Sequence, residues 1–418
     1  MDDMKTPRAE PRQLPARLRI VLAWSVVVGA GGSLIGLAYL GILHALEHAL
    51  GPHAHGPHVH LLIMVGIGVL VSLLVRCLGS PGDIELLVDN VHVLENGRAE
   101  TRHLRSLLPI SLLCISSGGG MGPEAPLVQT SGTSAQWLAE KRNMSQVERR
   151  MLTIAGMAAA FTVLFGAPIG AALFALEILH RRGLQYHEAL LPAVVASLIG
   201  YCVFVAASGL GLTPVWSFSS SAEPVPIDLV WAIGAGIFGG AVAITFTKSV
   251  ELARRAIRPI PEIWRPPLGG LVLGSLALIS PYSLTYGKYQ INPLLSMTAA
   301  PASYFVIGAL AKFLGTTATV ASGWRGGFII PLFFMGAALG HAIHLLVPST
   351  NEAVIGCALM AAANTGVTKT PLGSTLVVSK MVGLALVPTT AIGAVIALLM
   401  THRTGLLTSQ RERLMGER

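Results

Sequence analysis

Long stretches without a charged residue alternate with short charged segments along the whole chain. The charge-free stretches are Ile20 to Leu43, Met151 to Leu176, Ala189 to Ala222, Leu229 to Thr247, Leu268 to Gly287, Tyr289 to Ala311, Gly326 to Asn351 and Met381 to Thr401. A helix needs about 20 apolar residues to cross a bilayer, and most of these stretches provide them. The pattern predicts an all-α, polytopic membrane protein.

Some apolar stretches have the wrong length for one simple crossing. Leu61 to Val75 is short, whereas Ala189 to Ala222 is long and is interrupted by Pro192, Gly209 and Pro214. Interrupted helices are tolerated inside a membrane only where protein or a watery cavity covers the freed backbone groups. We therefore expect broken, tilted and re-entrant helices.

Composition and charge agree with this prediction. Hydrophobic residues make up 52% of the 418 residues and charged residues only 12%, about half the charged fraction of soluble domains. Disorder, a secreted disulfide scaffold and a soluble enzyme are poor fits. The net charge of +8 does not indicate nucleic-acid binding, because the basic residues cluster in short connections near 8–19, 141–150, 181–182, 254–265 and 403–418. Such clusters are typical of cytoplasmic loops, so both termini are predicted to be cytoplasmic.

Two sequence motifs occur twice, in the same order. Gly122 is followed by three residues, a proline and then small residues, and Gly327 begins the same pattern. The segment AAAFTVLFGAPIGAAL at 158–173 resembles AAANTGVTKTPLGSTL at 361–376, and both motif pairs have nearly the same separation. We predict membrane repeats at 20–210 and 228–405, joined through 211–265, with cytoplasmic tails at 1–19 and 406–418. Transport proteins often place a midplane site where such repeats meet.

A Gly-x-x-x-Pro segment before a helix favours anion binding. Glycine permits close backbone approach, and proline suits the first helical turn. The other N–H groups at that helix start have no intrahelical partner, and the helix dipole adds partial positive charge. Two such helix starts aimed at one point would bind an anion without a full positive charge.

These segments resemble the signatures of the CLC chloride channels and chloride/proton antiporters. Residues 122–126 read GPEAP against the family's G(K/R)EGP, and residues 327–331 read GFIIP against GxFxP. Residues 79–82, GSPG, match the third signature, GSGIP, less well, because they depart from it in sequence and in length. FGAP at 165–168 and RPPLGG at 265–270 also match. The resemblance extends from near Ile20 to near Gln410.

The resemblance implies a fold, an assembly and a location. It implies two inverted-topology repeats in one membrane domain, a homodimer with one pore per subunit, and the inner membrane of a bacterium. Chloride and similar small anions, and the lipid bilayer, are the expected partners, with bound chloride and no other cofactor. Few residues follow Thr401, so no soluble regulatory domain is expected.

Glu124 is the residue most expected to have a function. A glutamate at a helix start is often only a capping carboxylate. Here, however, the acid lies in an apolar membrane segment, where a charge is costly and usually functional. The resemblance implies that Glu124 is the outer gate, which competes with the anion until protonation removes its charge.

The resemblance also assigns anion binding to several other residues. These are Ser80, Gly122, Pro123, Ala125, Gly327, Phe328 and Ile329. The backbone N–H groups of Phe328 and Ile329 would bind the central anion, and the Ser80 hydroxyl would bind it at the inner mouth. Ser80 also fits an ordinary helix cap.

Two departures from the family pattern bear on the mechanism. Ile178 stands where antiporters of the family carry an inner glutamate for proton entry, and Glu177, next to it, points about 100° away on a helix. Leu407 stands where the family has a pore tyrosine, since no tyrosine follows Tyr304. An outer glutamate with apolar inner positions resembles the family's channels.

The hypothesis is therefore a passive chloride channel gated by Glu124. The alternatives are a chloride/proton antiporter with a water-mediated inner proton path, and a membrane scaffold or receptor without transport. Fluoride export has no clear support from the Gly79–Gly82 segment. No nucleophile–base pair or metal motif stands out, so we predict no enzyme and no metal site.

Other polar residues in apolar surroundings leave alternatives open. Six histidines lie in a loop expected to face outwards: His44, His48, His53, His55, His58 and His60. They are compatible with pH sensing, with metal binding or with a plain polar loop. Lys312 and Lys380 lie in apolar segments, where a lysine usually pairs, extends to the interface or faces a cavity.

Overall fold

The computed structural model describes residues 13–82, 88, 91, 101–180, 186–209, 214–218, 223–297, 299–407 and 410. Most of the two predicted tails therefore lies outside the described residues. The α-helices are α1 (Gln13–Leu50), α2 (Pro57–Leu78), α4 (Leu104–Ser116), α5 (Glu124–Lys141), α6 (Gln146–Phe165), α7 (Pro168–Glu177), α8 (Leu190–Ser208), α9 (Asp228–Ile257), α10 (Arg265–Ile279), α11 (Ile291–Leu295), α12 (Ala302–Ala321), α13 (Ile329–Leu346), α14 (Glu352–Thr368), α15 (Pro371–Val382) and α16 (Val387–Met400). Short 3-10 turns are η1 (Thr101–His103), η2 (His187–Ala189), η3 (Glu262–Trp264), η4 (Pro281–Ser283) and η5 (Leu384–Leu386). No strand occurs in the described part of the chain, which confirms the all-α prediction.

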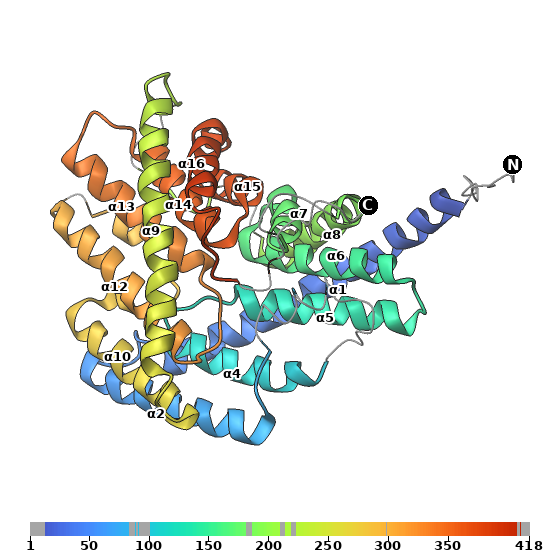
Figure 1. Ribbon diagram of the computed structural model, residues 1–418, viewed down its shortest axis with the longest axis horizontal. Helices are drawn as coiled ribbons and strands as arrows, with labels where there is room; N and C mark the ends of the chain where they lie inside the picture. Colours follow the sequence, from blue (N-terminus) through green and yellow to red (C-terminus); the bar gives the residue numbers. More distant parts are fainter. Residues whose placement is uncertain are drawn as a thin grey trace, which may run out of the picture.

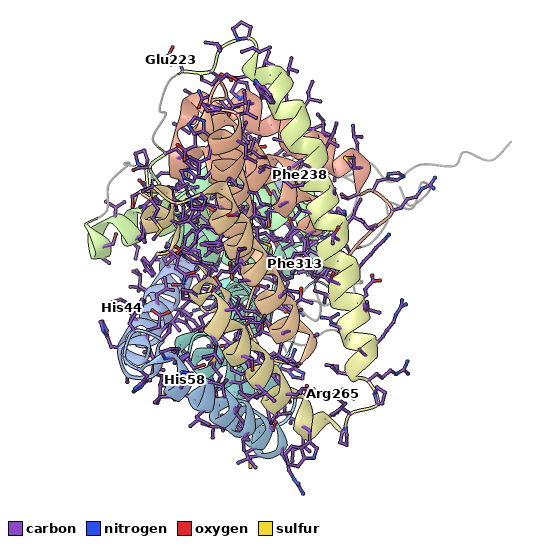
Figure 2. The ribbon with its side chains drawn as sticks, turned by 90° about the vertical axis from the view of Figure 1, so that its left-hand side faces the viewer. His44, His58, Glu223, Phe238, Arg265 and Phe313 are labelled. Carbon is purple, nitrogen blue, oxygen red and sulfur yellow. The ribbon has the colours of Figure 1, made fainter. Side chains whose placement is uncertain are left out.

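Six of the described helices are long and apolar enough to cross a membrane. They are α1, α2, the helix formed by η2 and α8, α9, α12 and α13. Large apolar side chains such as Leu62, Val230 and Leu399 are exposed on the outside of the molecule. Phe238 on α9 and Phe313 on α12 also lie on this surface and line a shared apolar groove (Figure 2). The protein is a multi-pass integral membrane protein, and exposed apolar side chains of this kind are typical of helices that span a membrane.

The two halves of the chain have the same pattern of helix contacts. In the first half α5 packs on α6, and α1 packs on both α6 and α8. In the second half α13 packs on α14, and α9 packs on both α14 and α16. Helices α5 to α8 and α9 to α16 lie on different sides of the molecule, while α2 lies against α10 and α7 against α15 (Figure 1). The boundaries given above for the two repeats remain predictions.

Predicted helix breaks occur in both halves. The stretch from Met151 to Leu176 forms two helices, because α6 ends at Gly166, whose φ of 61° is left-handed, and α7 begins with Pro168. A proline at the first helical position has no N–H to lose there. The equivalent break in the second half separates α14 from α15, which begins with Pro371. The breaks place short helices and their unpaired ends in the interior.

Candidate functional site

The starts of α5 and α13 meet in the interior of the molecule. The N–H of Gly122 donates to the carbonyl of Gly327 at 2.7 Å, and the N–H of Gly327 donates to the carbonyl of Gly122 at 2.6 Å. These are the first residues of the two Gly-x-x-x-Pro segments. The pair of hydrogen bonds therefore joins the two helix starts that the sequence predicted to converge.

The Glu124 carboxylate lies at the start of α13 and not in solvent. Its side chain is buried, and its Oε1 accepts a hydrogen bond from the N–H of Ile330 at 2.7 Å. A negative group is stabilised there by an otherwise unpaired N–H and by the helix dipole. Its other oxygen, Oε2, has no hydrogen-bond partner among the described residues. The carboxylate thus occupies the kind of helix-terminal position that suits a small anion.

Both glycines of the Gly122–Gly327 pair leave room for this carboxylate. A Cβ atom on Gly122 would lie 2.7 Å from both Cδ and Oε1 of Glu124. A Cβ atom on Gly327 would lie 2.9 Å from Cβ of Glu124. Ordinary contacts of a Cβ atom are 3.4 Å or longer. Any larger residue at either position would displace the Glu124 side chain or the backbone around it.

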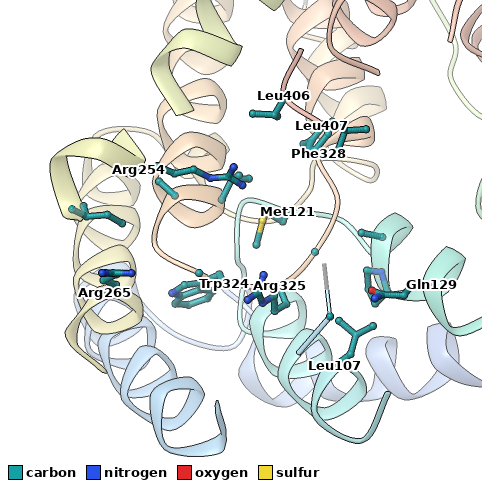
Figure 3. A pocket seen from close by; sticks show the side chains of 18 residues that line it. Leu107, Met121, Gln129, Arg254, Arg265, Trp324, Arg325, Phe328, Leu406 and Leu407 are labelled. Carbon is teal, nitrogen blue, oxygen red and sulfur yellow. The ribbon is translucent and has the colours of Figure 1, made fainter. Parts of the chain in front are cut away.

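A positively charged cavity lies on one side of the two helix starts. This arginine cavity has a volume of about 370 Å³ and is lined by Arg254, Arg265 and Arg325 (Figure 3). Ala125 at the start of α5 and Phe328 at the start of α13 also line it, together with Leu407 and Gly82. The arginines give this cavity a charge that attracts anions.

Two further cavities contact other residues around Glu124. The histidine cavity, of about 730 Å³, is lined by His44, His48, His53, Glu47 and Lys288, among others. A narrow cavity of about 40 Å³ shares His44, Glu47 and Lys288 with it and reaches Pro123 and Ile330. Among the described residues, none lines both the narrow cavity and the arginine cavity, and Glu124 lines neither. Glu124 is therefore buried where these cavities approach each other.

Comparison with known proteins identifies the family. The model of the voltage gated chloride channel family matches residues 67–402. The chain belongs to this family, the CLC family. The resemblance found in the sequence is thereby confirmed.

Relatives and solved structures of CLC proteins match most of the chain. It is 28% identical to a chloride/fluoride channel protein of Pseudomonas syringae pv. tomato, over 96% of this chain and 89% of that protein. It is 26% identical to the voltage-gated ClC-type chloride channel ClcB of Shigella flexneri, over 69% of this chain and 70% of that protein.

Two crystal structures have the same fold. A CLC-type fluoride/proton antiporter matches with a TM-score of 0.84 at 23% identity, over 97% of this chain and 100% of that chain. A slow cyanobacterial Cl⁻/H⁺ antiporter matches with a TM-score of 0.78 at 21% identity, over 91% of this chain and 94% of that chain.

Ser80 lies apart from the other predicted anion-binding residues. It is exposed after the end of α2, and its backbone carbonyl accepts a hydrogen bond from Nδ1 of His103 at 3.2 Å. Gly82 of the same segment lines the arginine cavity, whereas Ser80 does not. The residues at 83–87, which follow this segment, lie outside the described residues. The role of Ser80 stays a prediction.

Ile178, the position that the family resemblance assigns to the inner glutamate of antiporters, is an apolar side chain inside the molecule. Ile178 is 1% exposed and packs in the main apolar core. The Glu177 carboxylate accepts hydrogen bonds from the N–H groups of Leu372 at 3.1 Å and Gly373 at 2.8 Å. Glu177 thus caps the start of α15 from the end of α7, a structural role that the sequence reasoning missed.

Charged residues in apolar segments have identifiable surroundings. The buried Lys312 ammonium donates to the carbonyls of Leu284 and Thr285, each at 2.7 Å. Lys380 lines a cavity of about 380 Å³ together with Lys288. Sequence reasoning did not single out Lys288, although it is the one charged residue between two long apolar stretches.

Three of the six histidines, His44, His48 and His53, line the histidine cavity. His44 on α1 and His58 on α2 lie on the same side of the molecule (Figure 2). His44 Nδ1 lies 3.7 Å from a carboxylate oxygen of Glu47. Within the described ranges, no group of three or more His, Cys, Asp or Glu side chains is placed to bind a metal ion. Metal binding by this loop therefore has no support from the geometry.

Proposed function

We propose that this CLC protein is a passive chloride channel in which the Glu124 carboxylate is the gate. The observation that supports it is the position of this carboxylate. It accepts a hydrogen bond from the N–H of Ile330 at the start of α13 and lies between two cavities, which share no lining residue in the described part of the chain.

The gate works by competition for one position. While Glu124 is ionised, its charge and volume exclude an anion from the start of α13. Protonation removes the charge that the helix terminus stabilises, so the side chain can leave and an anion can take its place. The N–H groups of Phe328 and Ile329 then bind the anion that enters from the arginine cavity. The remaining backbone around this position comes from Gly122, Pro123 and Ala125 at the start of α5 and from Gly327 before α13. Ser80 remains the candidate ligand at the inner mouth.

The charge distribution supports an orientation. Arg254 and Arg265 flank a basic connection and line the arginine cavity. Basic connections stay on the cytoplasmic side, so the arginine cavity faces the cytoplasm and the histidine cavity faces outwards. Both termini would then be cytoplasmic, in the inner membrane of a bacterium. We propose a homodimer with one pore per subunit, as the family resemblance implied.

Three residues favour the channel over proton-coupled exchange. Ile178 cannot carry a proton, Glu177 is engaged in capping α15, and Leu407 offers no hydroxyl to the arginine cavity. The second candidate is a chloride/proton antiporter with a water-mediated inner path, because both solved structures reported above are described as antiporters. Fluoride belongs in the test as well, since one relative is described as a chloride/fluoride channel.

Flux measurements in liposomes test these proposals. We expect Glu124→Ala to give anion efflux that no longer depends on pH, whereas Glu251→Gln, an exposed glutamate on α9, leaves efflux unchanged. Unchanged efflux in Glu124→Ala would instead support a scaffold without transport. A channel gives a reversal potential set by the anion gradient alone. A shift of this potential with an imposed pH gradient would identify the antiporter, and chloride and fluoride are compared under the same conditions.

A further inference from the structure

Lys288 lies where three cavities adjoin. It lines the histidine cavity, the narrow cavity and the cavity that also contains Lys380. The gating mechanism proposed above gives no role to Lys288. A cationic side chain on the walls of adjoining cavities is a candidate for anion binding.

The narrow cavity connects Lys288 with the gate. Its lining includes Pro123, which precedes Glu124, and Ile330, whose N–H donates to the Glu124 carboxylate. The volume of about 40 Å³ is enough for a water molecule or a small monovalent ion. An anion there would lie between Lys288 and the position that Glu124 occupies.

The Lys288 ammonium has hydrogen-bonding capacity left for a ligand. It donates to the carbonyl of Leu164 at 3.3 Å, a long hydrogen bond, and makes no ion pair within the described chain. A lysine ammonium carries three donors, so two remain. Water or an anion in the narrow cavity can accept from them.

The segment that carries Lys288 is fixed in place by buried contacts. The indole N–H of Trp216 donates to the Lys288 carbonyl at 3.2 Å. Lys312 bonds the carbonyls of Leu284 and Thr285 and, at 3.1 Å, Oε1 of Gln290. A side chain on a segment fixed at both ends loses less entropy when it binds a ligand.

The other residues that line the narrow cavity explain why a cation is needed there. Glu47 and His44 of α1 line it, 3.7 Å apart, together with the phenols of Tyr286 and Tyr289. The Glu47 carboxylate opposes the entry of an anion, and the ionised Glu124 beyond it does the same. Among the described residues that line the narrow cavity, Lys288 alone is a lysine or arginine. Its positive charge offsets the negative charges of Glu47 and Glu124.

We propose that Lys288 is an anion-binding residue on the route from the histidine cavity to the gate. It binds a small monovalent anion of the halide class in the narrow cavity before the anion replaces the Glu124 carboxylate at α13. This inference rests on the gating function proposed above.

Currents in planar bilayers test the proposal, with chloride varied on one face at a time. We expect Lys288→Met to raise the half-saturating chloride concentration about 1.4- to fivefold on the face that contacts the histidine cavity, the range measured for single ion pairs in contact with water. The half-saturating chloride concentration on the face that contacts the arginine cavity should not change. Lys288→Arg should restore the wild-type value, and Lys248→Met, which removes an exposed lysine from α9, should have no effect.

Each outcome separates the two proposals. If Lys288→Met leaves both half-saturation values unchanged while Glu124→Ala alters the current, the anion site at Lys288 is wrong and the gate stands. If neither variant alters the current, the proposed function itself fails. A bromide-soaked wild-type crystal gives a readout that does not depend on the variants folding. An anomalous peak beside Nζ of Lys288 supports the site, and a peak at α13 without one at Lys288 overturns it.

Discussion

Replacing Gly122 with alanine should open the gate without removing the gating residue. The new Cβ atom would lie 2.7 Å from Cδ and Oε1 of Glu124, and its three nearest atoms all belong to this carboxyl group. The clash therefore falls on the free end of a side chain and not on the backbone. The carboxylate has to move away from α13, which breaks its hydrogen bond with the N–H of Ile330.

The size of the effect follows from this hydrogen bond. Hydrogen bonds to charged groups contribute about 1.5–3 kcal/mol, and 1.4 kcal/mol changes an equilibrium constant about tenfold. The equilibrium between the closed and open positions of Glu124 should shift by about 10- to 140-fold towards the open one. Chloride efflux at neutral pH should rise accordingly, until another step limits it.

Initial chloride efflux from liposomes measures this prediction against two controls. Gly234→Ala on α9 adds the same methyl group where no atom lies within 4 Å, and it should leave efflux unchanged. In the Glu124→Ala background, Gly122→Ala should add nothing, because the group that clashes is gone. Wild-type efflux from Gly122→Ala, or an equal increase in both backgrounds, would refute the steric argument.

Three further predictions concern acid–base behaviour, stability and the inner constriction. Acidification should increase wild-type efflux, because protonation frees Glu124, and should leave Glu124→Gln unaffected; equal pH dependence in both would contradict the gate. Glu177→Ala should lower the free energy of unfolding by about 1–3 kcal/mol through the uncapped start of α15, and an unchanged melting curve in detergent would contradict this. Leu407→Tyr should tighten chloride binding in calorimetry by adding a hydroxyl to the arginine cavity, and unchanged affinity would place residue 407 away from the anion path.

The repeated motif made the central feature of the site predictable. Gly122 and Gly327 stand at equivalent positions of the two repeats, and symmetric repeats bring equivalent segments together. Glu124 could be identified because an acid in an apolar segment is costly. The sequence did not predict that the carboxylate bonds Ile330, since this depends on how the Gly122–Gly327 hydrogen bonds set the distance between the two helices.

Contacts between the repeats account for what the sequence did not predict. Glu177 lies at the end of α7, and its partners lie at the start of α15, so no local pattern reveals the cap. Lys288 had a signal, a single charge between two apolar stretches, but its meaning depends on cavities formed by α1, α6 and α13. Spacing along the chain contains no information about such cavities.

The central claim is that an anion binds at the start of α13 when the Glu124 charge is absent. A bromide-soaked crystal of the Glu124→Gln variant tests it directly through anomalous scattering. The account predicts a bromide peak within hydrogen-bonding distance of the backbone N–H groups of Phe328, Ile329 or Ile330. A map with bromide in the arginine cavity but none at this helix start would contradict it.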